Sequence, residues 1–515
     1  MTEPSVPSSG LPVRPPARDP RPGVSGLEPA RLAELLARMG EPPFRAQQVG
    51  DAVWRSDAVS WDAVTTLARS LRAGLAERLR FDTVADTELR LADADATEKA
   101  LHCLSDGRLV ESVLMHYPAR GERRERNTLC ISSQAGCAVG CPFCATGELG
   151  FERDLEVAEI VDQVRHARRR LAARGRHLTN LVFMGMGEPL LNLDAVIDAA
   201  LALTDGDRFG LGSRHITIST SGVVPGIERL TALGPQWTLA VSLHAARDSL
   251  RDLLVPLNRR WPVRAVVAAA AGYASATGRR VSYEYVMIDG LNDTAADADA
   301  LARLLAGSGS HVNCIPMNPV AHTPWQASGP DRMEAFAGRL RVAGIGVTIR
   351  RNRGQEVGAA CGQLAAERSA EPTAVAVARR RERLVAASAA ALAGERSEEP
   401  TIAGLAWASP GPPTDGVPFR AGIPQPRAAG KGAPRPDAGR ANVPRGAVAR
   451  GGAPRGEAPR GDGPRRTGPR PPGPRPVPRQ DADRSARPQH PGNRSDTSRP
   501  ASGRRPPGPP KRAGG

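Results

Sequence analysis

The chain has 515 residues and a formal net charge of +16, from 70 Lys and Arg against 54 Asp and Glu. Almost all of that excess lies beyond residue 420, where 21 basic residues face 6 acidic ones, so residues 1–420 are close to neutral. The sequence shows neither the apolar core of a secretory leader nor an apolar run of transmembrane length, so we expect a cytoplasmic protein and no membrane partner.

The first hundred residues are expected to be mainly helical. Residues 1–24 are Pro-rich and polar, which predicts disorder. Within residues 25–96, apolar residues recur every three or four positions over 27–40, 44–55 and 61–79, which predicts helices of a small accessory domain. Such a domain could dock a large substrate, and a purely structural role fits the same pattern.

Predicted strands and helices alternate over residues 97–368. Amphipathic segments at 157–174 and 194–204 separate several of the strands. Repeated strand–helix units require parallel strands joined by right-handed crossovers. We therefore expect an α/β fold, a complete or partial (β/α) barrel, with its chemistry at the carboxyl ends of the strands. The predicted strands are 109–117, 128–134, 180–185, 215–220, 238–244, 281–288, 311–318 and 346–351.

Two further segments follow the alternating region. Residues 369–395 predict a carboxyl-terminal helix, and residues 396–515 predict a disordered tail that becomes rich in Pro, Gly, Arg and Ala. Dispersed arginines suit a loose, salt-dependent attraction to RNA phosphates. A solubilising linker without a partner explains the composition of the tail equally well.

Three cysteines close together carry the strongest chemical signal. Cys137, Cys141 and Cys144 have the spacing Cys-x-x-x-Cys-x-x-Cys, and no fourth cysteine follows at short range. Three thiolates can bind three irons of a [4Fe-4S] cluster and leave one iron open, whereas a ferredoxin-like carrier uses four cysteines. A zinc site and buried structural thiols are the alternatives, but structural zinc requires four ligands and no local His or Cys completes that set. Such thiols also require a reducing compartment.

Glycines and polar residues follow several predicted strands at their carboxyl ends. Each of them alone is typical of a turn or a cap, but as an ordered series after the cysteine triplet they favour a cofactor site. Glycines allow close approach of the backbone, Glu188 could accept from an ammonium group, and the others suit a ribose or a carboxylate. The candidates are Gly187, Glu188, Ser219, Ser242, Leu243, His244 and Asn318.

The motifs occur in a recognisable order. FRAQQV, TLCISSQAGCAVGCPFCATG, GMGEPLLN, STSGVVP, SLHAARDSLRDLLVPLN, YEYVMIDGLND, NCIPMNP and AACGQL closely resemble segments of the radical S-adenosylmethionine (SAM) dual-specificity RNA methyltransferases. That family methylates C2 of an adenine in 23S rRNA and of an adenine in certain tRNAs. The resemblance spans about residues 27–368, and the Pro/Arg tail has no counterpart in the family pattern.

The resemblance implies a role for each candidate residue. The cysteine triplet would hold one [4Fe-4S] cluster, and the series of strand-end residues would contact SAM. Cys361 in AACGQL would become S-methylated, Cys130 in TLCISS would be its thiol partner, and Glu111 in VESVLMHY would be a proton acceptor. Either Glu111 or Cys130 could take the C2 proton. Cys103 and Cys314 match no role.

The implied mechanism uses two SAM molecules per methyl group. One would methylate the Cys361 thiolate, and the second, reduced through the cluster, would form a 5′-deoxyadenosyl radical that removes hydrogen from the S-methyl group. The carbon radical would add to C2, which is electron-poor. Cys130 would then attack the Cys361 sulfur, releasing methylated RNA and leaving a transient disulfide. A flavodoxin or ferredoxin would supply electrons, and we expect a monomer.

Two other functions fit parts of the same pattern. A methyltransferase of the antibiotic-resistance type, which modifies C8 of the adenine, would share the cluster, both reactive cysteines and most SAM contacts. The FRAQQV segment and the later motifs favour C2. A non-catalytic, cluster-containing RNA-binding factor would depend on the basic tail instead, and would leave Cys361 and Cys130 dispensable.

Overall fold

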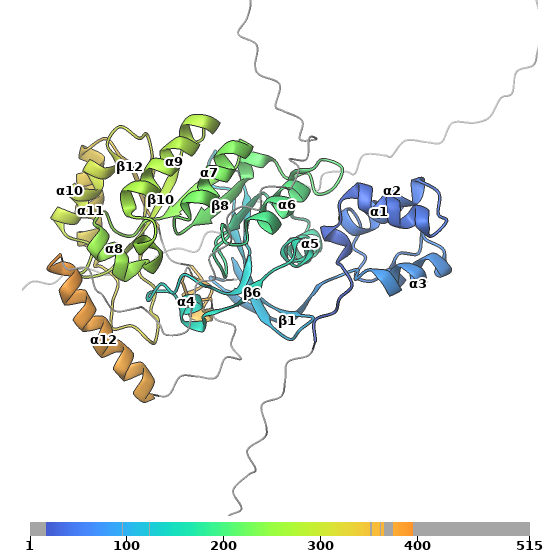
Figure 1. Cartoon of the computed structure of the whole chain (residues 1–515), viewed down its shortest axis with the longest axis horizontal. Helices are drawn as coiled ribbons and strands as arrows, with labels where there is room; N and C mark the ends of the chain where they lie inside the picture. Colours follow the sequence, from blue (N-terminus) through green and yellow to red (C-terminus); the bar gives the residue numbers. More distant parts are fainter. Residues whose placement is uncertain are drawn as a thin grey trace, which may run out of the picture. The chain divides into compact units, whose positions relative to one another are not determined.

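The structure, a computed structural model, describes residues 17–394 except 95, 123, 351–352, 361 and 365–373 (Figure 1). The described residues all belong to one compact unit of the chain. Cys361, residues 1–16 and the tail from residue 396 onward lie outside the described part. Among the described residues, no helix is long and apolar enough to span a membrane.

Three short helices form the amino-terminal part. They are α1 (Pro29–Arg38), α2 (Phe44–Trp54) and α3 (Arg69–Arg78). The segment 61–79, predicted as one helix, is instead a short 3₁₀ turn (Trp61–Ala63) followed by α3. The intervening Val64, Thr65 and Thr66 are β-branched and disfavour helix, and Val64 turns its side chain into the core.

The ordered chain begins earlier than the sequence predicted. Val24, within the segment expected to be disordered, is buried, and its N–H donates to the carbonyl oxygen of Arg80 at 2.9 Å. Burial of this apolar side chain and pairing of its backbone explain the difference.

A buried arginine joins the helical part to the rest of the fold. Arg165 on α5 (Val157–Ala172) donates to the carbonyl oxygens of Val53 at 3.0 Å and Phe81 at 2.9 Å. Its guanidinium also pairs with Asp162 one turn earlier, at 2.6 Å. Because all of these groups are buried, they fix α5 against the end of α2 and the chain that enters the sheet.

A ten-stranded sheet forms the centre of the described part, in the order β1-β2-β3-β4-β7-β8-β9-β10-β11-β12. Strands β1 to β4 are antiparallel neighbours, and from β4 onward each neighbouring pair is parallel. The strands are β1 (Val84–Ala92), β2 (Thr97–Leu104), β3 (Leu109–Tyr117), β4 (Arg126–Cys130), β7 (Asn180–Phe183), β8 (Ile216–Thr220), β9 (Thr238–Ser242), β10 (Ser282–Met287), β11 (His311–Pro316) and β12 (Gly346–Ile349).

The eight predicted strands are confirmed as β3, β4 and β7 to β12, with ends that differ by a few residues. Strands β1 and β2 were not predicted. Because β1 pairs with β2 in the sheet, the helical part ends before Val84 and not at residue 96. Both missed strands carry many charged residues, which weakens the alternation that marks a strand.

Helices connect the parallel strands, as a partial (β/α) barrel requires, and this expected architecture is confirmed (Figure 1). After α5 they are α6 (Leu193–Thr204), α7 (Val224–Leu233), α8 (Asp248–Leu254), α9 (Val263–Thr277), α10 (Ala295–Leu305) and α11 (Pro330–Val342). Strands β1 and β12 form the two edges of the sheet, so the barrel is open. A last helix, α12 (Ala374–Leu392), lies within the predicted range 369–395.

Candidate active site

One cavity lies at the carboxyl ends of the parallel strands and brings together most of the predicted site. It contains about 1020 Å³ of empty space, including its open mouth. Nine of the predicted residues line it: Cys137, Cys141, Cys144, Gly187, Glu188, Ser219, Ser242, His244 and Asn318. They come from segments up to 181 residues apart in the sequence. The parallel strands β7 to β11 carry the polar residues to the same end of the sheet, and the loop that holds the cysteines lies beside them.

The cysteine loop is held between two short elements that pack closely. It begins after β5 (Gln134–Gly136), which pairs with β6 (Phe151–Asp154), and it ends at α4 (Ala145–Leu149). A Cβ atom at Gly136, whose φ is +74°, would lie 1.9 Å from the carbonyl oxygen of Gly150. A Cβ atom at Gly147 would lie 2.8 Å from the carbonyl oxygen of Cys141. Glycines are therefore required for the loop to close on itself.

Later segments of the chain also hold this loop. A ring nitrogen of His322 lies 2.9 Å from the carbonyl oxygen of Pro142, between two of the cysteines. The N–H of Ala145 donates to the carbonyl oxygen of Gly362 at 2.7 Å. From α12, Arg380 forms an ion pair of 2.5 Å with Glu148 on α4. The loop is thus fixed from three sides.

The thiols of the loop fit an iron–sulfur cluster with three protein ligands. Burial raises the pKa of the Cys137 thiol to about 12 and raises that of Cys141 well above its ordinary value. Thiolates at these positions of the cavity are therefore unstable without a nearby positive charge, which bound iron would supply. Within the described residues, Cys137, Cys141 and Cys144 are the three cysteines that line this cavity. Three sulfurs without a fourth are the donor set expected for a cluster with one open iron.

The GMGEP turn packs against the cysteine loop. Gly187 has a φ of +100°, and a Cβ atom there would lie 2.5 Å from the side chain of Gln134. The Glu188 carboxylate accepts from the N–H groups of Leu190 at 3.0 Å and Ser221 at 2.6 Å. Burial nevertheless raises the pKa of Glu188. Two hydrogen bonds therefore orient this carboxylate, and an ammonium group beside it would stabilise its negative charge.

His244 is held as a neutral donor. Its backbone has a φ of +60°, a strained value for a residue with a side chain. Its Nδ1 accepts from the N–H of Val286 at 3.0 Å, so the ring proton lies on Nε2. Burial and the charge of Arg251 lower the pKa of His244 to about 3. Phe143 packs edge-on against the ring, with centroids 4.8 Å apart.

Leu243 is the one predicted SAM contact that does not line the cavity. Its side chain is fully buried, its N–H donates to the carbonyl oxygen of Glu284 at 3.0 Å, and its own carbonyl accepts from Arg251 at 3.0 Å. Alternation along the strand explains this, because Ser242 and Leu243 point to opposite faces. The role assigned to Leu243 therefore rests on the resemblance alone.

The sequence did not indicate Arg251, which holds the ends of β8 and β9 together through hydrogen bonds. Its buried guanidinium donates to three backbone carbonyls and one side chain: Leu243 O at 3.0 Å, Ser242 O at 3.1 Å, Ser221 O at 2.6 Å and Asn258 Oδ1 at 2.9 Å. Burial lowers the pKa of Arg251 to about 10, so it stays charged at neutral pH. In the sequence it resembles a surface residue of a short helix, and no local signal marks it.

The sequence analysis did not identify Glu284 and Arg350 as site residues either, although the sequence around Glu284 contains an indication. Both line the cavity, and they pair at 3.3 Å. Glu284 is the one charged residue of strand β10, and a buried charge in a strand marks a functional or paired group. Arg350 follows β12 and gave no such indication.

A second cavity adjoins the first and contains the predicted thiol partner. Cys130, at the end of β4, lines it together with Cys144, Met184 and Gly185, which belong to both cavities. It contains about 790 Å³ of empty space, including its opening. Ala360 and Gly362 also line it, and they flank Cys361, which is itself outside the described residues. The described neighbours of Cys361 in the chain therefore line the same cavity as Cys130.

Glu111 lies beside this second cavity in a buried ion pair. It is on β3, and its Oε1 lies 3.0 Å from Nζ of Lys99 on β2. Val113 and Met115 share its face of the strand and line the second cavity. Val113 is also the partner of Cys130 in the β3–β4 register. Glu111 is therefore close to the predicted site of chemistry.

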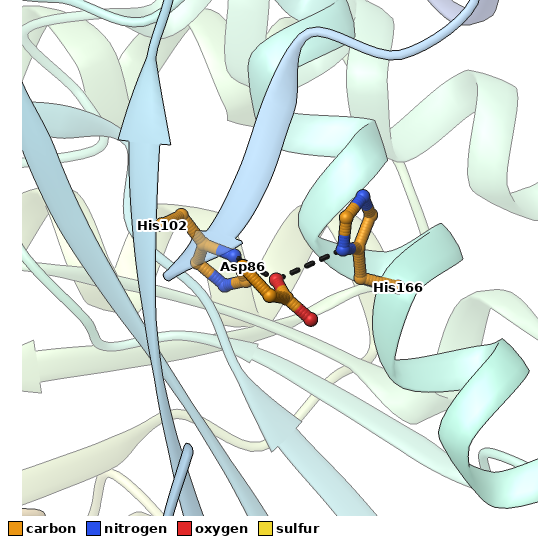
Figure 2. Close-up of side chains that lie close together, drawn as sticks. All are labelled: Asp86, His102 and His166. Atoms are coloured by element: carbon orange, nitrogen blue, oxygen red, sulfur yellow. Dashed lines mark ion pairs between the residues drawn. The ribbon is translucent and has the colours of Figure 1, made fainter. Parts of the chain in front are cut away.

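A cluster of potential metal ligands lies away from both cavities. Asp86 of β1, His102 of β2 and His166 of α5 point toward one another, as Figure 2 shows. Their atoms are already paired, since Asp86 Oδ1 lies 2.6 Å from His102 Nδ1 and 2.9 Å from His166 Nδ1. Arg170 adds a third partner, 2.6 Å from Asp86 Oδ2. These are hydrogen-bond distances, and the cluster is an ion-pair network that joins α5 to the first two strands.

The charge state of His166 follows from its two neighbours. Its Nε2 lies 2.9 Å from Asp82 Oδ2, so both ring nitrogens face carboxylates, which can only accept. His166 is therefore doubly protonated. Burial alone would lower its pKa, but the hydrogen bonds to Asp82 and Asp86 raise it above the ordinary value. The buried ring of His102 has a lowered pKa and remains neutral.

His166→Gln is expected to lower the free energy of unfolding by about 2 kcal/mol at pH 6, because hydrogen bonds to a charged group are lost. A raised pKa in the folded state means that this stabilisation is complete below about pH 6.5 and is lost as the pH rises through the folded value. The difference between the two proteins should therefore shrink toward pH 9. Urea unfolding at both pH values measures it, and an equal loss at pH 6 and pH 9 would contradict the assignment.

Comparison with known proteins identifies two family models in the chain. Residues 131–304 match the radical SAM superfamily, and residues 24–80 match the ribosomal RNA large subunit methyltransferase N-terminal domain. The first match contains the cysteine loop and most of the cavity residues. The second covers the three amino-terminal helices.

Full-length relatives and a solved structure agree with these matches. A protein of Frankia alni, described as "Probable dual-specificity RNA methyltransferase RlmN", is 50% identical over 343 residues, 65% of this chain and 80% of that protein. One of Thermobifida fusca with the same description is 47% identical over 68% of this chain and 97% of its own length. A radical SAM methyltransferase from Sphaerobacter thermophilus has a TM-score of 0.64 and 46% identity, covering 67% of this chain and 99% of that structure.

Proposed function

Because this chain belongs to the RlmN family of dual-specificity RNA methyltransferases within the radical SAM superfamily, we propose that it methylates C2 of a specific adenine in 23S rRNA. We extend the proposal to an adenine in the anticodon loop of some tRNAs. The reaction would take place in the cytoplasm, where thiols stay reduced and both RNAs are found.

The proposal rests on one observation: the two cavities adjoin each other and share several lining residues. One contains the cysteine triplet and the polar strand ends, and the other contains Cys130. A cofactor in the first would therefore lie next to a nucleobase in the second. A target adenine in a loop can leave its stack at modest energetic cost and enter such a cavity.

The cavity residues would hold the two cofactors in fixed positions. Cys137, Cys141 and Cys144 would bind a [4Fe-4S] cluster, which, with SAM on its open iron, supplies the reducing power for radical chemistry. Glu188 would accept from the amino group of SAM. His244, with its proton on Nε2, would donate to an acceptor of the same ligand, and Ser219 and Asn318 would bind its polar groups.

Two cysteines would carry the methyl group and release the product. Cys361 would be methylated on sulfur and would become linked to C2 of the adenine through that carbon. Cys130 would then attack the Cys361 sulfur, which frees the methylated RNA and leaves a disulfide between the two cysteines. The disulfide must be reduced by an external thiol before the next turnover. An electron donor such as flavodoxin or ferredoxin would serve the cluster.

Removal of the C2 proton has two candidate bases. Cys130 lines the second cavity, whereas the Glu111 carboxylate points to Lys99. Oε1 of Glu111 is engaged by Nζ of Lys99 at 3.0 Å, whereas a general base must reach the proton that it removes. We favour Cys130 as the group that contacts the adenine, with Glu111 and Lys99 in support.

Analysis of nucleosides from modified RNA tests the proposed function. Purified enzyme with reductant, SAM and unmodified 23S rRNA should form 2-methyladenosine at one position, and Cys361→Ala should form none while retaining its iron. Formation of 8-methyladenosine would support the antibiotic-resistance type of activity instead. Full methylation by Cys361→Ala would contradict the mechanism, and absence of any methylation by the wild type would contradict the function.

A further inference from the structure

Two arginines and a tyrosine lie together at the solvent side of the second cavity. Tyr117 ends β3, Arg126 begins β4 as its partner in the register, and Arg353 follows β12. The guanidinium carbons of Arg126 and Arg353 lie over the Tyr117 ring, 4.2 Å and 4.4 Å from its centroid. We call these three residues the cationic mouth.

The cationic mouth is connected to the interior of the cavity. Tyr117 and Arg353 line the cavity that contains the buried Cys130, and both are partly exposed to solvent, while Arg126 is exposed. Arg353 is anchored, since its Nη1 donates to the carbonyl oxygen of His116 at 3.0 Å. The two charges are therefore held where a strand of RNA would pass if one of its bases entered the cavity.

Neither arginine has a counter-ion within the described part of the chain. No carboxylate lies within 4.0 Å of either guanidinium among these residues, although many other arginines of this protein are paired. The neighbouring Glu125 lies nearer to His116 and Arg176, at 3.8 Å and 3.7 Å. By contrast, Arg350, also in the cavity, is paired with Glu284. Two adjacent unneutralised cations repel each other, which favours an anionic ligand between or beside them.

We propose that the cationic mouth binds phosphate groups of the RNA strand on either side of the target nucleotide. Tyr117 is a positioning residue that keeps both guanidinium groups in place through cation–π contacts. The inference rests on the proposed function for the identity of the RNA, and concerns residues outside the cofactor site. Guanidinium groups suit this role because they present several donors to one phosphate.

Binding of a synthetic RNA hairpin with one unpaired adenine in its loop, measured between 50 and 300 mM salt, tests the proposal. Arg126→Gln and Arg353→Gln should each weaken binding roughly threefold to tenfold at low salt. Each should also lower the slope of log affinity against log salt by about 0.7, the value for one lost contact to a single-strand phosphate. The basic tail is present in every variant, so its contribution cancels.

Arg264→Gln is the matched control, because Arg264 is an exposed arginine on the outer helix α9. It should bind RNA as the wild type does. Tyr117→Phe should also behave as the wild type, whereas Tyr117→Leu should weaken binding, since only the aromatic ring is required. Iron content and thermal midpoint establish that each variant is folded.

The binding data and the methylation assay answer separate questions. If Arg126→Gln and Arg353→Gln keep the affinity and salt slope of Arg264→Gln, the cationic mouth is not a phosphate site, whatever the enzyme methylates. If the slopes fall as expected while the wild type methylates no RNA, the inference stands and the proposed function fails. If the cationic mouth binds phosphate and the wild type methylates RNA, Arg126→Gln and Arg353→Gln should raise the KM for RNA and leave kcat within about twofold.

Discussion

Cys141→Ala is expected to yield a folded protein that holds no iron–sulfur cluster and methylates no RNA. A site that uses only three protein thiolates loses a required ligand with any one of them, and an alanine side chain cannot coordinate iron. The loop itself should survive, because its closure depends on Gly136, Gly147 and contacts from His322 and α12 and not on this sulfur. Iron and sulfide analysis of anaerobically purified protein, with the paramagnetic signal after reduction, measures the loss.

Cys103→Ala is the matched control for this experiment. Cys103 is a free, partly exposed thiol of β2 that lines neither cavity of the active site. It should retain full iron content and activity. A Cys141→Ala protein with a normal complement of iron would show that the cysteine triplet is not the ligand set, and would refute the assignment of the cavity.

Arg251→Met is expected to cost about 4 kcal/mol or more of unfolding free energy. Methionine has a similar length but no donors, so two buried acceptors and two partly buried ones lose their hydrogen bond, and each buried loss costs about 1–3 kcal/mol. Relief of the desolvated charge offsets part of that loss. Three of the acceptors are carbonyls at the ends of β8 and β9, which border the cavity. The substitution should therefore weaken SAM binding even under conditions in which the protein stays folded. The midpoint of urea unfolding and SAM affinity report the two effects.

Two other substitutions test whether the lost hydrogen bonds cause the loss of unfolding free energy in Arg251→Met. Arg251→Lys should fall between the wild type and Arg251→Met, because one ammonium group has three donors and cannot reach four separated acceptors. Arg264→Met, at an exposed position of α9, should change stability by less than about 0.5 kcal/mol. A stability of Arg251→Met within about 1 kcal/mol of the wild type would contradict the role of Arg251.

Local patterns in the sequence determined much of this protein. Eight strands were predicted because apolar, β-branched segments alternate with amphipathic helical ones, and this alternation of strands and helices predicts a (β/α) barrel. The carboxyl ends of parallel strands meet at one edge of a sheet, so the sequence alone could assign Glu188, Ser219, Ser242 and Asn318 to a common site. The spacing of the three cysteines defines a donor set by itself.

Only the tertiary structure decided which other groups complete the site. Arg251 and the Glu284–Arg350 pair act through contacts between segments that lie far apart in the sequence, and the direction of the Leu243 side chain depends on its place directly after β9. The cationic mouth likewise forms because β3, β4 and the chain after β12 converge, which brings Arg353 to Tyr117 across 236 positions. Periodicity describes neighbours along one element, whereas packing of distant elements sets the charge and shape of a cavity.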